Sequence, residues 1–247
     1  MKKQNRIGSM NESSLHEALK SLYAGKGCET EANLDGYIVD IRSKGRIVEI
    51  QTGGFSSLRD KIMSLLPKYR IRVVYPLAVE KTLVVIDPGT KETAYSRKSP
   101  KKGELIDIAR EILYIPRSIL HPNFSLEVLL TKEEEVRSAD GKGSWRRRGM
   151  SIVDRKLLAI IGRVEFKRAA DYLRLLPDGL PRSFTNRVVA GIMRRPIEKV
   201  GRLTYSLRRL GLLKITGREG NANVFRIAAP GNSSKSRDAR GKPIKKP

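Results

Sequence analysis

Residues 34–52 read LDGYIVDIRSKGRIVEIQT, and this stretch decides the fold class. β-branched residues flank Ser43-Lys44-Gly45, which predicts two strands joined by a tight turn. Side chains alternate along a strand, so Glu49 and Gln51 share one face of the second strand. An acid inside an apolar strand is costly to bury unless something pairs it, and a hard cation is a common partner. The hairpin therefore predicts a metal site suited to phosphodiester chemistry.

Three features follow one another across residues 11–66: a helical histidine, an acid before a hairpin, and an acid-x-polar pair on the next strand. His16 is the histidine, Asp35 the first acid, Glu49 the second acid and Gln51 the polar residue. This order resembles the PD-(D/E)XK nuclease superfamily, most closely its RecB-like branch. The chain departs from that family in two ways, since no proline precedes Asp35 and Gln51 stands where the family has lysine.

The resemblance implies a metal-dependent DNA endonuclease with a restriction-endonuclease-like mixed α/β sheet flanked by helices. The catalytic set that it implies is Asp35, Glu49 and Gln51. The set that would hold Mg²⁺ or Mn²⁺ is His16, Asp35, Glu49 and the Ile50 carbonyl. Because Gln51 brings no positive charge, Arg59 or Lys61 on the next predicted helix is expected to supply it.

The turn inside the hairpin decides which aspartate shares a face with Glu49. A three-residue Ser43-Lys44-Gly45 loop sets Asp35 on that face. A two-residue Lys44-Gly45 turn instead places Asp40 opposite Glu49, because a shift of one residue exchanges the two faces. The family resemblance and the left-handed conformation open to glycine favour the longer loop, and hence Asp35.

Composition points to a polyanionic partner. The 247 residues include 50 Lys or Arg and 26 Asp or Glu, a net charge of +24, and nucleic acid is the commonest partner of such a chain. The single cysteine, Cys28, excludes an intrachain disulfide, and no apolar run approaches the length of a membrane span. We expect a cytoplasmic, nucleoid-associated protein that binds DNA and no membrane. A homodimer, or protein partners in a DNA-processing complex, are compatible with this expectation.

Hydrophobic periodicity and turn residues predict four segments. These are a nuclease-like domain at 11–136, a basic linker at 137–151, a second domain at 152–229 and a disordered basic tail at 230–247. Within the first domain we expect helices at 13–24, 56–66 and 104–113, strands at 71–78 and 82–86, a basic loop at 96–102 and an edge strand at 125–130. The acidic run Glu133-Glu134-Glu135 is expected to be a solvated turn.

The second domain is expected to begin with helices at 154–164 and 168–175. Helices at 186–194 and 197–210 follow, and then a two-stranded hairpin at 213–227. In the helix at 197–210, the spacing places Val200, Leu203 and Leu207 inward. Helix, turn, basic helix and hairpin together resemble a winged helix-turn-helix domain, which implies DNA binding.

Basic side chains on both domains are the expected DNA contacts. They are Arg59, Lys61, Arg97, Lys98, Lys101, Lys102, Arg146, Arg147, Arg148, Lys199, Arg202, Arg209 and Arg218. Two other functions remain open at this point. The replacement of lysine by Gln51 is compatible with a nuclease fold that binds DNA without cutting it, and the net charge is equally compatible with an RNA-processing nuclease.

Overall fold

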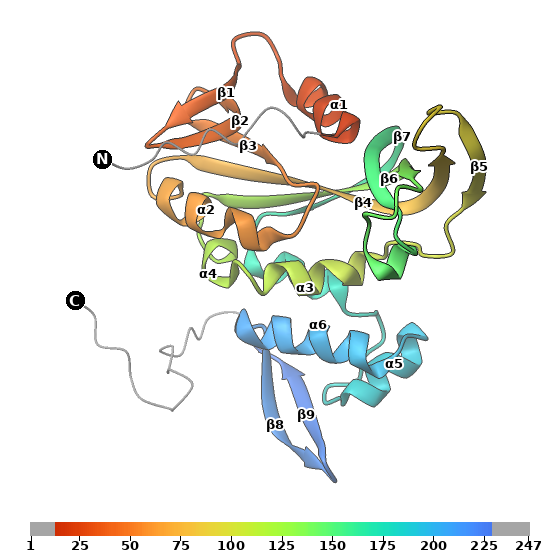
Figure 1. The fold of residues 1–247 in the computed structure, drawn as a ribbon. Coiled ribbons are helices and arrows are strands. Elements are labelled where there is room, and N and C mark those ends of the chain that lie inside the picture. Colours follow the sequence, from red (N-terminus) through yellow and green to blue (C-terminus); the bar gives the residue numbers. More distant parts are fainter. Residues whose placement is uncertain (1–12, 229–247) are drawn as a thin grey trace. The chain divides into compact units, whose positions relative to one another are not determined.

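The computed structural model describes residues 13–228, which fall into two compact units (Figure 1). Unit 1 contains residues 13–105 and 117–167, and unit 2 contains residues 106–116 and 168–228. The domain boundary predicted at residue 152, and the predicted linker before it, therefore lie inside unit 1. Residues 106–116, predicted as part of the first domain, belong to unit 2. The predicted tail at 230–247 lies outside the described residues.

Unit 1 is built on a seven-stranded mixed sheet in the order β1-β2-β3-β4-β6-β7, with β5 paired to β4. The strands are β1 (Glu29–Leu34), β2 (Tyr37–Ser43), β3 (Arg46–Ile50), β4 (Arg70–Ile86), β5 (Thr93–Lys98), β6 (Phe124–Ser138) and β7 (Ser151–Phe166). Strand β4 runs parallel to β3 and to β6, and the other pairs are antiparallel. The predicted mixed α/β class is confirmed.

Helices cover both faces of this sheet (Figure 1). Helix α1 (Ser14–Tyr23) begins after the cap residue Ser13, and its Leu15 and Leu19 pack on Ile50 of β3 and on neighbouring strands. On the other face, the 3-10 turn η1 (Phe55–Leu58) leads into α2 (Arg59–Leu65). Phe55 meets the edge of the Tyr75 ring of β4 at a centroid distance of 5.2 Å. The sheet is therefore buried between α1 and the η1–α2 segment.

Two tight turns set the register of the first three strands. Ser43 pairs with Arg46, so the β2–β3 hairpin has the two-residue loop Lys44-Gly45, with φ of 32° and 78°. The three-residue loop favoured by the sequence is wrong. Asp35 and Gly36 form a second two-residue turn, between β1 and β2, with φ of 51° and 85°. Positive φ at both central residues is characteristic of type I′ hairpin turns.

The long strands differ most from expectation. Strand β4 is continuous where two strands were predicted, and β6 is a central strand, not an edge strand ending at residue 130. Part of the predicted basic loop at 96–102 belongs to β5. Pro76 is tolerated within β4 because the last pair between β3 and β4 is Ile50–Val74, so no β3 backbone lies beside the proline.

Residues 154–164, predicted as a helix, are part of β7. Three register shifts along the β6–β7 pair each leave one residue of β7 without a partner on β6. These residues are Val153, Leu158 and Ile161, and each is at least half exposed. Such bulges interrupt the alternation of a strand and leave apolar spacings that imitate a helix.

Unit 2 is mainly helical and ends in a hairpin. Its elements are α3 (Ile108–Ile112), η4 (Ala169–Leu175), α5 (Asn186–Met193), α6 (Ile197–Arg209), β8 (Leu213–Glu219) and β9 (Ala222–Ile227). Val200, Leu203 and Leu207 of α6 are buried, as predicted. The Ser206 hydroxyl donates to the Ala109 carbonyl of α3 at 2.6 Å.

Two short helical elements lie where the chain passes between the two units in sequence. They are η2 (Leu105–Asp107) and α4 (Pro116–Ile119), where the chain leaves unit 1 and returns to it. None of the helices described between residues 13 and 228 is long and apolar enough to cross a membrane.

Candidate functional site

Two carboxyl groups, one buried and one mostly buried, lie where the β2–β3 ladder ends. The last pair of the hairpin ladder is Ile41–Val48, so Asp40 and Glu49 are the next residues on the two strands. The Ile50 amide donates to Asp40 Oδ2 at 2.6 Å, which means that a side chain, and not the β2 backbone, accepts this bond. Glu49 is 3% exposed. The tight Lys44-Gly45 turn thus brings two carboxyl groups together at the end of a ladder.

Helix α1 supplies a histidine to Asp40. His16 Nε2 lies 3.5 Å from Asp40 Oδ1, and both side chains are mostly buried. Burial alone would raise the pKa of Asp40. Hydrogen bonds from His16 and from the Ile50 amide, with the charges of His16 and Lys61, instead hold that pKa below its ordinary value. Asp40 is therefore a carboxylate at neutral pH.

Helix α2 supplies a lysine to Glu49. Lys61 Nζ donates to Glu49 Oε2 at 2.6 Å. Burial raises the pKa of Glu49 to about 7, although the charge of Lys61 opposes the change, and the charge of Asp40 adds to it. The other oxygen, Oε1, is buried and has no hydrogen-bond partner among the described residues. Glu49 thus keeps one acceptor for a further ligand.

Gln51 is engaged by its own loop. Its Nε2 donates to the Gly54 carbonyl at 2.7 Å and lies 3.3 Å from the Ser57 hydroxyl, at the start of η1. Of the two basic residues of α2 that the sequence suggested beside the site, Lys61 is the one that contacts Glu49. The other, Arg59, is exposed.

Asp35, the aspartate that the sequence favoured, lies outside this group. It sits in the β1–β2 turn, where its Oδ2 accepts from Lys68 Nζ at 2.8 Å and its side chain is 36% exposed. The turn precedes Asp40 by at least three residues of extended strand, roughly 10 Å. The shorter hairpin loop is the physical reason, because it moves Asp40 into the place assigned to Asp35.

The acidic side chains of this group are the candidate ligands for a divalent ion. Within residues 13–228, no three His, Cys, Asp or Glu side chains lie close enough to form a complete cage. The available ligands are the carboxylates of Asp40 and Glu49, and the free acceptor is Glu49 Oε1. Mg²⁺ is commonly held by one or two carboxylates while it keeps several waters. Asp40 and Glu49 fit Mg²⁺ or Mn²⁺ on these terms, as a pair of carboxylates.

A family model described as "Domain of unknown function (DUF8091)" matches residues 13–167, more than half of the chain. The chain belongs to this family. The match ends at the last residue of unit 1 and includes both acids of the site.

The similarity to one relative covers more of the chain than the family model does. Over 232 residues the chain is 32% identical to a protein of Treponema pallidum (strain Nichols) described as uncharacterized, covering 92% of this chain and 90% of the relative. Unit 2 is therefore largely within the shared region. No solved structure matches the chain.

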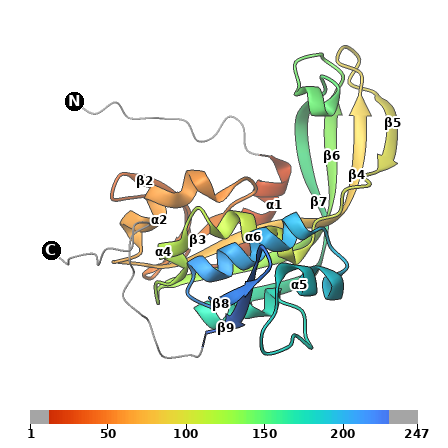
Figure 2. The ribbon, with the colours of Figure 1, turned by 90° about the horizontal axis from the view of Figure 1, so that it is seen from below.

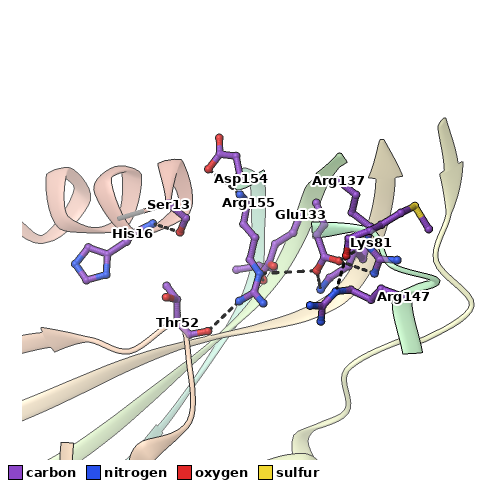
Figure 3. Close-up of polar contacts among 12 residues, drawn as sticks. Ser13, His16, Thr52, Lys81, Glu133, Arg137, Arg147, Asp154 and Arg155 are labelled. Carbon is purple, nitrogen blue, oxygen red and sulfur yellow. Dashed lines mark hydrogen bonds and ion pairs between the residues drawn. The ribbon is translucent and has the colours of Figure 1, made fainter. Parts of the chain in front are cut away.

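A second buried polar group lies farther along the sheet within the family domain. Glu135 accepts from Lys81 at 2.8 Å and from Arg137 at 2.6 Å, and these charges hold its pKa below the ordinary value although burial opposes them. Arg155 extends from β7 and donates to the Thr52 carbonyl at 3.2 Å, as Figure 3 shows. Arg155 thus connects the loop that follows Gln51 to the central strands.

The predicted solvated turn at Glu133-Glu134-Glu135 is wrong, because these residues lie within β6. Glu133 is buried like Glu135, and its Oε1 accepts from the Thr131 hydroxyl at 2.6 Å. Sequence reasoning missed this group because Lys81 and Arg155 reach Glu135 from other strands.

The predicted DNA contacts are mostly solvent-exposed. In unit 1 the exposed ones are Arg59, Arg97, Lys98, Lys101, Lys102, Arg146 and Arg148, and Arg147 is half-buried. In unit 2 they are Arg202, Arg209 and Arg218. Two predicted contacts are already engaged by acids, Lys61 by Glu49 and Lys199 by Asp107 at 2.6 Å.

The raised pKa of Glu49 predicts a pH-dependent stability. A carboxyl group whose pKa rises on folding stabilises the fold fully below its unfolded pKa of 4.5, and this contribution is lost as the pH rises through about 7. Relative to Glu49→Gln, the wild type should lose on the order of 3 kcal/mol of unfolding free energy across that window. Denaturant titrations in the presence of a chelator measure this, and a pH-independent difference would contradict the account.

Proposed function

We propose that the protein is a metal-dependent nuclease that hydrolyses phosphodiester bonds in DNA. The observation that carries the proposal is the buried pair Asp40 and Glu49, with a histidine beside one acid and a lysine beside the other. Buried carboxyl groups with shifted pKa values are typical of catalytic centres. The net charge of +24 supports a polyanionic substrate.

The order of elements supports the resemblance to the PD-(D/E)XK superfamily. A helix carrying His16 precedes a hairpin, and the hairpin is followed by a helix and a parallel strand. With Asp40 in the place of the motif aspartate, Glu49 remains the motif acid and Gln51 the residue at the lysine position. The restriction-endonuclease-like fold is part of this proposal.

Each residue has a distinct part in the proposed reaction. Asp40 and Glu49 would hold Mg²⁺ or Mn²⁺, and the Ile50 amide and His16 orient Asp40. A bound divalent ion supplies an activated water and stabilises charge on the phosphoryl group. Lys61 adds a fixed positive charge beside Glu49, the part that the motif lysine plays in the family.

Unit 2 is proposed to be a winged helix-turn-helix domain that holds DNA. Phe184 forms an isolated antiparallel bridge to Phe225, so one residue outside the named strands pairs with β9 of the β8–β9 hairpin. Arg202 and Arg209 are exposed on α6, seven residues apart and hence on one side of the helix. This arrangement fits a recognition helix whose basic side faces a groove.

A second candidate is a nuclease fold that binds nucleic acid without cutting it. The observation that favours it is the short Lys61–Glu49 pair, because an ammonium group already occupies one oxygen of the acid. The absence of lysine at position 51 points the same way. Metal-dependent cleavage by the purified protein separates the two candidates.

Asp40→Ala and Glu49→Ala should each abolish cleavage and leave DNA binding intact, because these acids would hold the ion and not the phosphate backbone. Asp35→Ala is the matched control and should cut like the wild type, since Asp35 lies in the exposed turn. Nicking of plasmid, fork and four-way-junction DNA, and cleavage of RNA, in Mg²⁺ or Mn²⁺ measure this. Loss of activity in Asp35→Ala but not in Asp40→Ala would overturn the assignment.

Lys61→Ala should reduce the cleavage rate by a factor of roughly 100 or more, because removing one electrostatic stabiliser typically has that effect. Gln51→Lys in the Lys61→Ala background should recover part of the rate by placing an ammonium group at the motif position. The measurement is single-turnover cleavage at saturating protein. If wild type and Lys61→Ala are equally active, Lys61 has only a structural part.

Replacing Arg202 and Arg209 together with alanine should weaken DNA binding by the full chain. If both contact phosphates, the slope of log affinity against log salt should become shallower by roughly two units, for all sequences alike. Fluorescence anisotropy across a salt series in a chelator measures the slope. An unchanged slope would show that this side of α6 does not contact DNA.

A further inference from the structure

The loop at 139–150 connects β6 to β7 at the far end of the sheet. Figure 2 shows the far halves of β4, β6 and β7, with β5, extending beyond α1 and α2. The loop is closed by its own hydrogen bonds. The Gly143 amide donates to the Gly149 carbonyl at 2.7 Å, and Asp140 Oδ1 accepts from the Lys142 amide and from the Ser151 hydroxyl. Its shape is therefore fixed without any partner.

This closed loop displays a tryptophan. Trp145 begins the 3-10 turn η3 (Trp145–Arg147) and is 83% exposed, and it is the only tryptophan of the chain. The Arg146 guanidinium carbon lies 5.4 Å from the centroid of its ring. An exposed aromatic ring on an ordered loop is suited to contact a partner, because aromatic side chains contribute much of the binding energy at interfaces.

The positive charge around the ring favours a negatively charged partner. Residues 139–150 include four Lys or Arg and one acid, Asp140, which already accepts hydrogen bonds from the Lys142 amide and the Ser151 hydroxyl. Arg146 and Arg148 are exposed, and so is Ser144, which precedes the tryptophan in the chain. Exposed polar and basic residues next to the ring favour a polyanion over the apolar interior of a lipid layer. A ring with basic side chains beside it fits a base with its flanking phosphates.

We infer that the 139–150 loop is a binding site for an unpaired base, with the Trp145 ring stacked on the base and Arg146 and Arg148 on the adjoining phosphates. The inference rests on the proposed function only in taking nucleic acid as the partner. Bases within a duplex are already stacked on one another, so a ring outside the helix reaches them only at single strands, ends or junctions. The site therefore favours nucleic acid with unpaired bases over intact duplex.

The single tryptophan makes the inference directly measurable, because selectively excited emission comes from Trp145 alone. The probes are a single-stranded oligonucleotide, the same sequence as a blunt duplex, inorganic polyphosphate and anionic lipid vesicles. They are added to full-length Glu49→Ala protein in a chelator. The single strand should quench the emission at lower concentration than the duplex does, and polyphosphate and vesicles should leave it unchanged. Equal quenching by single strand and duplex, or a response to vesicles, would overturn the inference.

Two variants separate stacking from simple apolar contact. Trp145→Leu should weaken binding of a labelled single strand by roughly 10- to 100-fold, whereas Trp145→Phe should retain most of the affinity, because only phenylalanine keeps a ring. Duplex affinity should change little in either variant. Equal losses in Trp145→Leu and Trp145→Phe, or no loss in either, would contradict stacking. These assays need no cleavage, so an inactive nuclease site would overturn the proposed function and leave this inference standing.

Discussion

The burial of two carboxyl groups side by side is the constraint on which this site depends. Folding removes most of the solvent around Asp40 and Glu49 at the end of the β2–β3 ladder. Two negative charges in such a place destabilise a fold unless other groups compensate them. Compensation comes from three elements, since α1 supplies His16, α2 supplies Lys61 and β3 supplies its own Ile50 amide. The packing of both helices on the sheet is thereby tied to the charge state of the site.

The helices of the chain and part of the site could be predicted from local signals. The apolar spacings predicted α1, α5 and α6 closely, because the face of a helix is encoded within a few residues. His16 and Glu49 were candidates because they fall on positions of the family motif, and Lys61 because Gln51 brings no positive charge. Which aspartate lies beside Glu49 depended on one residue of register. The Asp35-Gly36 pair is itself a typical type I′ turn signal, and it could have removed Asp35 from the candidates.

The far part of the sheet could not be predicted, because its determinants are not local. Strand β7 reads as a helix since its bulged residues, among them Leu158 and Ile161, disturb the alternation that identifies a strand. The acids of β6 were predicted to form a solvated turn because three of them are consecutive in the sequence. Glu135 is buried nonetheless, since Lys81, Arg137 and Arg155 surround it from three strands. Lys81 and Arg155 are too distant in sequence from Glu135 to leave a pattern within a window of a few residues.

Binding of a divalent ion to the Asp40–Glu49 pair is the central claim, and calorimetric titration of Mn²⁺ into the full-length protein tests it most directly. Wild type and Asp35→Asn should bind the ion with the same affinity, and Asp40→Asn should not bind it at the same concentrations. The wild type should also release protons on binding near neutral pH, because the pKa of Glu49 is about 7 in the free protein. No binding by the wild type, or a loss confined to Asp35→Asn, would contradict the account.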